Sequence, residues 1–581
     1  MLRKFISCIK GYEKPTILTP TFMLAEVSME CIMPLIIADL INEIEAGCGM
    51  DVIIQKGLLL VLMAMISLAG GAGAGYFAAR ASAGFAKNLR HAEFESIERF
   101  SFENIDKYSS SSLVTRMTTD VSNVQMAFMM LIRTAFRSPL MFIFSIIMAY
   151  RMGGALAGTY AVLIPILGFG LYFISKKAMP AFRSVFRKYD KLNESIEENV
   201  MAMRAVKGFV REDYEKKKFG DAAENIRRDF THAERIVALN SPLMQLCMYA
   251  NTAIIAYIGS RTIVTSMGID LGVGQLSGLL TYGVQILMSL NMLSMIYVML
   301  TMAAESAKRI SEVLVEEPTI KNPENPVTEI KNGDIDFENV SFKYSARAER
   351  YALEGINLHI KSGETVGILG GTGSSKTTLI QPISRLYDVT EGVVKVGGVD
   401  VRDYDIEALR NSVAVVLQKN LLFSGTIADN LRWGNENATD EELREACALS
   451  QAEEFINSFP EGYDTMIEQG GTNVSGGQKQ RLCIARALLK KPKILILDDS
   501  TSAVDTKTDA LIRRGFDKFI PETTKIIIAQ RVASVENADK IIIMDNGKIA
   551  DVGTHDELLS RSDIYREIYE QQVKGGAEDE K

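Results

Sequence analysis

The sequence has 581 residues, which is too long for one hydrophobic core, so we expect several domain-sized units. Its formal net charge of −8 argues against a nucleic-acid partner, which would require a basic face. Hydrophobic residues make up 47% of the chain but are unevenly spread. The first half is strongly apolar, whereas the second half has the pattern of a soluble α/β domain.

The first half contains six segments that are apolar enough to cross a bilayer, which takes about 20 residues each. The connections between them alternate in length and charge: residues 81–123 and 177–236 are long and rich in Lys and Arg, whereas 43–52 is short and acidic. Positive charge marks cytoplasmic loops, so we predict that the long connections and both termini lie in the cytoplasm. The predicted spans are residues 17–42, 56–80, 124–150, 154–176, 237–264 and 275–303.

The two long connections have no hydrophobic stretch of their own but a helical pattern. We expect them to continue the membrane helices into the cytoplasm and to turn back through short crosswise helices near 102–112 and 205–215. The second turn offers Phe209 as an apolar tip, followed closely by Arg211. These turns are either solvated hairpins or coupling elements that touch a cytoplasmic domain.

Two predicted spans carry charged pairs. Glu26 and Glu30 lie four residues apart in the first, and Arg133 and Arg137 lie four apart in the third, so each pair shares one helix face. Ionisable groups at membrane depth are costly unless they are paired or hydrated. They therefore form either structural ion pairs or a polar lining of a substrate path, unless the arginines lie at the inner interface.

The second half begins after a charged, proline-bearing linker at 316–331. Residues 365–380 (TVGILGGTGSSKTTLI) combine an apolar strand, a glycine-rich turn and a helix start. This order predicts a phosphate-binding loop, in which backbone N–H groups surround a triphosphate, Lys376 reaches its β and γ phosphates, and Thr377 completes a magnesium shell. Ser375 stands where the motif has glycine.

Further motifs flank this loop. The strand pattern at 335–345 ends near Tyr344, an aromatic that could stack on adenine or fill the core. Residues 493–499 (KILILDD) predict a buried strand that ends in two acids, of which Asp498 is the candidate to hold magnesium. Gln418 follows another strand, and residues 474–481 (VSGGQKQR) predict a second anion-binding helix start.

In order and spacing, these motifs resemble an ATP-binding-cassette (ABC) domain, and the whole chain resembles a half-transporter of the bacterial exporter type. The resemblance implies an α-helical transmembrane bundle of six spans with long cytoplasmic extensions, fused to an α/β P-loop ATPase cassette. We place the transmembrane domain at 1–315, the linker at 316–331, the nucleotide-binding domain at 332–575 and a tail at 576–581.

The resemblance also assigns roles to single residues. It implies Thr377, Gln418 and Asp498 around the Mg²⁺ that accompanies ATP, Asp499 and Gln530 in the catalytic positions, and Phe209 and Arg211 in coupling to a cassette. A partner's ATP would meet the signature residues Ser475, Gly476, Gly477 and Gln478, next to the D-loop residues Ser502 and Asp505. The implied ATP-binding residues are Tyr344, Gly370, Gly371, Thr372, Gly373, Ser374, Ser375, Lys376, Thr377, Thr378 and Gln418.

The chain departs from the family pattern at three positions. The catalytic glutamate is replaced by Asp499, one methylene shorter, the switch histidine by Gln530, and the last loop glycine by Ser375. All three belong to the site that this chain's own phosphate loop supplies, whereas the signature segment is intact. We therefore expect a heterodimer, in which a non-identical half-transporter carries the glutamate and histidine and this chain's own site binds ATP but hydrolyses it slowly.

The predicted function is ATP-driven export of drug-like amphipathic small molecules across a bacterial inner membrane, in which the chain spans the bilayer several times. The alternatives are a slow homodimeric exporter, an ATP-gated channel or regulator, and an importer of metal chelates built on an exporter fold. The predicted partners are a second ABC half-transporter, the lipid bilayer and a small-molecule substrate, without nucleic acid.

Overall fold

The computed structural model describes residues 2–345, 347–499 and 504–578. The chain divides into two compact units, which we describe separately. The first comprises Met1–Arg99 and Tyr108–Glu316, and the second comprises Phe100–Lys107 and Glu317–Lys581.

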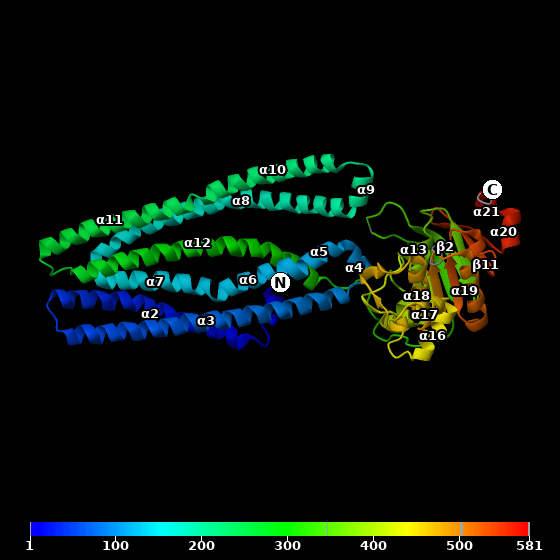
Figure 1. The fold of residues 1–581 in the computed structure, drawn as a ribbon, viewed down its shortest axis with the longest axis horizontal. Coiled ribbons are helices and arrows are strands. Elements are labelled where there is room, and N and C mark those ends of the chain that lie inside the picture. The colour runs from blue at the N-terminus through cyan, green and yellow to red at the C-terminus, as the bar shows by residue number, and fades with distance from the viewer. Residues whose placement is uncertain (1, 346, 500–503, 579–581) are drawn as a thin grey trace. The chain divides into compact units, whose positions relative to one another are not determined.

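The first unit is helical. Its long helices pack mainly as α2 against α3, α7 against α12, and α8 against α10, and α8 and α10 run side by side and are joined through α9 (Figure 1). A π-helical turn, η1, and a 3₁₀ turn, η2, interrupt the series. The elements are α1 (Leu2–Ser7), α2 (Glu13–Glu45), α3 (Met50–Glu98), α5 (Ser110–Thr115), η1 (Arg116–Asp120), α6 (Val121–Ile132), α7 (Thr134–Gly153), η2 (Gly154–Thr159), α8 (Tyr160–Met201), α9 (Met203–Gly208), α10 (Glu212–Val237), α11 (Asn240–Ser266) and α12 (Val273–Val315).

The predicted spans fall largely in these helical elements. The third is divided between α6 and α7 at Arg133, the fourth between η2 and α8, and the fifth begins at Val237, the last residue of α10, and passes through a turn into α11. Within the described residues, three helical stretches are long and apolar enough to cross a membrane: Met50–Glu98, Ser110–Met201 and Val273–Val315. The second stretch contains the third and fourth predicted spans. Helices α2 and α11 are not among these stretches; α2 carries acidic residues, and α11 is interspersed with Asn, Ser and Thr. The count of six spans therefore stays a prediction.

The long connections are helical, as predicted. Helix α3 runs unbroken to Glu98, α8 runs to Met201, and α10 leads back, so the apolar helices do extend into polar sequence. Short helices lie at both predicted turns: α4 (Phe102–Lys107), which belongs to the second unit, and α9.

One buried carboxylate ties the π-helical turn of the first unit to α12. The Asp120 side chain is fully buried and accepts hydrogen bonds from Ser306 Oγ at 2.8 Å and from Arg309 Nε at 2.7 Å. A buried carboxylate is tolerated only when such partners satisfy it, so this contact fixes how η1 packs on α12.

The second unit contains two main sheets. The larger runs in the order β12-β11-β3-β10-β9-β6, parallel except for the edge strand β12, and the smaller runs β2-β1-β4-β5, antiparallel. The strands are β1 (Ile335–Phe342), β2 (Leu353–Ile360), β3 (Thr365–Gly370), β4 (Glu391–Val396), β5 (Val399–Asp400), β6 (Val413–Val416), β7 (Gly425–Thr426), β8 (Met466–Ile467), β9 (Ile494–Asp498), β10 (Thr524–Ile528), β11 (Lys540–Asp545) and β12 (Lys548–Gly553).

The central strands β9 and β10 of the larger sheet are buried along their whole length, which explains the apolar runs ILIL and III in them. Alternate residues of β9 enter different cores: Ile494 and Ile496 pack towards the smaller sheet, and Leu495 and Leu497 pack towards helices such as α18. The remaining elements of this unit are α13 (Lys376–Ile380), η3 (Val401–Asp403), α14 (Ile406–Ser412), α15 (Ile427–Arg432), α16 (Asp440–Leu449), α17 (Glu453–Ser458), η4 (Gly462–Asp464), η5 (Gln469–Gly471), α18 (Gly476–Leu488), α19 (Thr506–Phe519), η6 (Val532–Ser534), α20 (His555–Arg561) and α21 (Asp563–Glu578).

The Asp120 contact gives a stability prediction. Asp120→Ala removes the acceptor for Ser306 and Arg309 and should destabilise the first unit by about 2 kcal/mol, the usual range for hydrogen bonds to a charged group. The melting temperature of the detergent-purified chain, followed by scanning fluorimetry, should fall by several degrees. The matched control is Asp221→Ala on the exposed face of α10, which should leave it nearly unchanged. Equal melting temperatures for the two variants would contradict this role of Asp120.

Candidate functional site

The candidate site lies at one edge of the larger sheet. In the parallel pairing, Ile528 of β10 lies opposite both Asp498 of β9 and Ile368 of β3, and Leu497 lies opposite Val416 of β6. The carboxyl ends of these strands therefore meet at the same edge, where ligands of parallel α/β sheets bind. The four predicted motifs that follow these strands come together there.

The glycine-rich loop joins β3 to α13. A Cβ atom at Gly370 would lie 2.2 Å from the Met544 carbonyl oxygen, so only glycine fits there. Gly373 has φ +83°, in the left-handed region that glycine adopts without strain. Lys376 Nζ donates to the carbonyl oxygens of Gly370 at 2.9 Å and Gly371 at 2.8 Å, so the lysine folds over the loop.

Ser375, the residue before Lys376, replaces the glycine of the family motif and adopts an unfavourable backbone conformation. Ser375 has φ 74° and ψ 25°, a left-handed conformation that costs a non-glycine residue roughly 1 kcal/mol. The structure keeps the loop in the glycine-type conformation despite the serine. Residues Thr372, Ser374 and Thr378 complete the loop and its helix, as predicted from their order, and Ser374 and Thr378 are buried.

Oxygen ligands for a cation lie below the loop. Thr377 Oγ1 donates to Asp498 Oδ1 at 3.1 Å, and burial raises the pKa of Asp498 while this hydrogen bond opposes the shift. A hydroxyl and a carboxylate are the donor types that Mg²⁺ prefers, so these two residues fit the ion that accompanies ATP. Burial also lowers the pKa of Lys376, and a bound triphosphate would favour its charged form.

The two catalytic-position residues are in direct contact. Gln530 Nε2 donates to Asp499 Oδ2 at 2.8 Å, and Gln418 Nε2 donates to the same oxygen at 3.3 Å. Gln418, expected near Mg²⁺, therefore directs its amide group at Asp499. Asp499 also has φ 48°, a conformation that non-glycine residues keep only where the surroundings enforce it, often at functional sites.

The signature segment opens α18. Ser475 is the N-cap: its Oγ accepts from Gln478 N at 3.3 Å, and Gln478 Oε1 accepts from Ser475 N at 2.8 Å, which makes a capping box. Ser475 and Gly476 are exposed and Gly477 is half-buried, so this helix start faces outward.

Of the two predicted D-loop residues, the structure describes Asp505. Asp505 caps α19 and accepts from Thr508 N at 2.9 Å and Thr508 Oγ1 at 2.7 Å, and these hydrogen bonds lower the pKa of Asp505. Ser502 lies outside the described residues.

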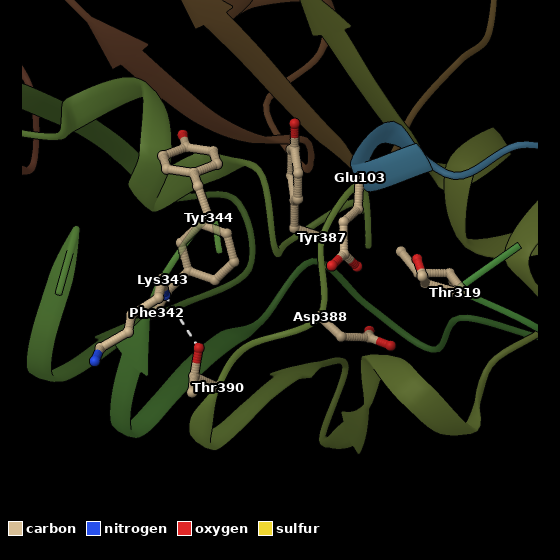
Figure 2. A pocket seen from close by; sticks show the side chains of 9 residues that line it. Glu103, Thr319, Phe342, Lys343, Tyr344, Tyr387, Asp388 and Thr390 are labelled. Carbon is tan, nitrogen blue, oxygen red and sulfur yellow. Dashed lines mark hydrogen bonds between the residues drawn. The ribbon is translucent and has the colours of Figure 1, made fainter. Parts of the chain in front are cut away.

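Tyr344 stands beside the phosphate-loop helix. Its hydroxyl forms hydrogen bonds with Thr378 Oγ1 at 3.0 Å and Gln381 Oε1 at 2.8 Å, and its ring meets that of Tyr387 edge-on at 5.4 Å. Both rings line a cavity of about 260 Å³, together with Glu103 and Asp388. Figure 2 shows the side chains that line it. The interaction of Tyr344 with adenine stays a prediction.

The remaining predicted residues belong to the first unit. Arg137 Nη2 contacts Glu30 Oε2 at 2.7 Å and Glu26 Oε1 at 3.5 Å, so the charged faces of α2 and α7 are paired through one arginine. Among the described residues no ion pair involves Arg133, which lies at the break between α6 and α7. At the α9 turn, Phe209 is 80% exposed, and Arg211 lies over the Tyr214 ring.

Sequence reasoning missed one contributor to this site. Gln480 is buried and its Nε2 contacts the Asp499 carbonyl oxygen at 3.5 Å. The first crosswise turn, expected near 102–112, agrees with the predicted contact to a cytoplasmic domain: segment 100–107 packs within the second unit, where Asn104 Nδ2 donates to the Glu317 carbonyl oxygen at 3.1 Å and the Tyr387 hydroxyl donates to Asp106. The one sequence signal for Gln480 is its place in the VSGGQKQR segment, two residues after the signature glutamine Gln478.

Comparisons with known proteins agree with this geometry. Residues 17–290 match the ABC transporter transmembrane region and residues 353–502 match the ABC transporter family. The uncharacterized ABC transporter ATP-binding protein YfiB of Bacillus subtilis is 35% identical over 98% of both chains, and a similarly described protein of Mycobacterium tuberculosis is 34% identical over 96% of both.

A solved structure shows the same fold. A bacterial Atm1-family ABC exporter with ATP bound superposes with a TM-score of 0.82 over 98% of both chains, at 22% identity. Together with the phosphate loop, the signature segment and the paired acids at one sheet edge, these matches show that the chain belongs to the ABC transporter family, with a helical transmembrane domain followed by an ATP-binding cassette.

Proposed function

We propose that this chain is one subunit of an ATP-driven exporter whose other subunit is a non-identical ABC half-transporter. As a family member, the chain is an ATP-hydrolysing transporter by type. The observation that carries the finer proposal is the 2.8 Å contact between Gln530 and Asp499, since it joins two of the family departures in one site.

The contact explains slow hydrolysis at this chain's own site. A general base must come within hydrogen-bond reach of the attacking water. The Asp499 carboxylate is one methylene shorter than glutamate, and amide groups of Gln530 and Gln418 already donate to one of its oxygens. A glutamine side chain donates a hydrogen bond to a phosphate but does not take up a proton as histidine does.

Binding of ATP depends mainly on other groups than those two side chains. The loop glycines provide the backbone N–H groups, Lys376 supplies the positive charge, and Thr377 and Asp498 would hold the Mg²⁺ that neutralises the phosphates. This site therefore supports a long-lived nucleotide that keeps two cassettes together.

The signature segment would serve the partner's site. Its helix start is capped and faces outward, and α18 is long enough to carry a dipole whose positive end attracts phosphate. A partner with glutamate and histidine in the two catalytic positions would form a competent site with it, while this chain retains ATP.

The helical unit would carry the substrate and the coupling. The exposed Phe209 and the neighbouring Arg211 suit a contact with a cassette, and segment 100–107 is already bound to this chain's own cassette. Pairing of Arg137 with Glu30 supports the structural interpretation of the intramembrane charges. We propose six spans in a bacterial inner membrane and drug-like amphipathic substrates.

The purified chain alone should bind Mg-ATP but turn it over slowly. Loss of a positioned base typically costs 10²–10⁴ in rate, so we expect less than about 0.1 s⁻¹, against a median near 10 s⁻¹ for enzymes. Phosphate release in nanodiscs measures the rate, and equilibrium binding measures affinity. Lys376→Ala should abolish binding, and this loss would show that the nucleotide binds at the phosphate loop. Turnover of several per second by the isolated chain would contradict the proposal.

Restoring both family residues should restore hydrolysis. Asp499→Glu combined with Gln530→His should raise turnover of the chain at least about tenfold. Because the two side chains touch, the effects of the two single changes on turnover should not add. The gains of the two single variants together should be smaller than the gain of the double variant. The matched control makes the same exchanges at exposed positions, Asp545→Glu with Gln571→His, and should leave the rate unchanged. If the double variant stays as slow as the control, these departures do not limit the site.

A further inference from the structure

The loop after β10 places Gln530 at the site. Its side chain contacts Asp499, so the position of that side chain depends on where the backbone of residues 529–535 is held. The loop includes the short 3₁₀ turn η6, and Val532 and Val535 are buried in the main core.

Gln572 of the C-terminal helix α21 holds this loop from one side through two hydrogen bonds, a contact that we call the grip. Gln572 Nε2 donates to the Gln530 carbonyl oxygen at 2.8 Å, and Val532 N donates to Gln572 Oε1 at 2.8 Å. One amide thus satisfies an acceptor and a donor on either side of Arg531, as a neighbouring strand would. Two hydrogen bonds to one planar group fix both the position and the orientation of the loop.

The helix that carries Gln572 is itself anchored. Tyr565 is fully buried in the same core as Val532, and its hydroxyl lies 2.6 Å from His555 Nδ1. Ile568 and Tyr569 also pack against that core. Gln572 follows Tyr569 by three residues, so it lies on the anchored face of α21.

The other side of the loop is held by α19. Arg513 Nη1 donates to the Ala533 carbonyl oxygen at 3.0 Å, and Ser534 Oγ contacts Asp509 Oδ2 at 3.4 Å. The D-loop residue Asp505 is the N-cap of α19. The loop is therefore held between the helix that follows the D-loop and the helix that ends the chain.

We propose that Gln572 is a positioning residue: it holds the Gln530 backbone so that the side chain of Gln530 meets the terminal phosphate of ATP, and it thereby sets how strongly this site prefers ATP over ADP. The proposal rests on the proposed function, because it assigns Gln530 to the γ-phosphate. ADP has no such phosphate, so its binding should not depend on the grip.

The test compares two adjacent glutamines in the full-length chain. Gln572→Met keeps length and helix propensity but removes both hydrogen bonds to the loop. Gln571→Met is the matched control, since Gln571 donates to Glu567 within its own helix. Hydrogen exchange of the peptide covering 529–535 reports the contact between Gln572 and the loop directly, because the Val532 amide donates one of the two hydrogen bonds in that contact. Equilibrium titrations with Mg-ATP and Mg-ADP report the consequence.

Gln572→Met should speed exchange at Val532 by about 3- to 10-fold and reduce the ATP/ADP affinity ratio by about 2- to 5-fold, with ADP affinity and melting temperature unchanged. Gln571→Met should change neither. Equal exchange in the two variants overturns the grip, and faster exchange with an unchanged ratio overturns its link to the nucleotide. A wild-type chain that binds no ATP would contradict the proposed function instead, and the exchange comparison would still decide the grip.

Discussion

The hydrogen bond between Gln530 and Asp499 depends on the register of two parallel strands. Because Ile528 of β10 lies opposite Asp498 of β9, the residues that follow these partners emerge side by side at the carboxyl edge of the sheet. β3 is the other neighbour of β10, so the phosphate loop emerges at the same edge. Nucleotide binding and the altered catalytic positions are thus consequences of one strand register.

Different groups at this sheet edge serve nucleotide binding and hydrolysis. Binding uses backbone groups, Lys376 and the Thr377–Asp498 pair, and these follow directly from the loop conformation. That conformation persists although Ser375 adopts a left-handed φ of 74°. Hydrolysis instead needs one side chain to reach a water molecule, and in our proposal the shorter Asp499, held by amide donors, does this poorly. Our proposal therefore assigns the departures a far larger effect on the rate than on the affinity.

Much of this site follows from sequence pattern. The apolar run at 494–498 with its two acids became β9, the glycine-rich loop lies where its strand and helix predicted, and the long polar connections are helical. The Ser475–Gln478 capping box also follows the S-x-x-Q pattern. These features are local, since residue spacing alone specifies them.

Contacts between distant residues were beyond sequence reasoning. Nothing near Gln530 predicts that Gln572, 42 residues later, binds its backbone, and the turn expected near 102–112 did not identify Glu317 as the partner of Asn104. The break at Arg133 also has no glycine or proline beside it to mark it, and the apolar residues on both sides of it predicted one span. Such features arise from tertiary packing, which local periodicity does not encode.

The chemical state of retained nucleotide tests the central claim most directly. The purified chain is loaded with Mg-ATP, passed through a desalting column, and the nucleotide that elutes with the protein is identified after several minutes. A site that binds ATP and rarely cleaves it predicts mainly intact ATP. Recovery of mainly ADP would show that this chain hydrolyses the nucleotide it holds and would contradict the account.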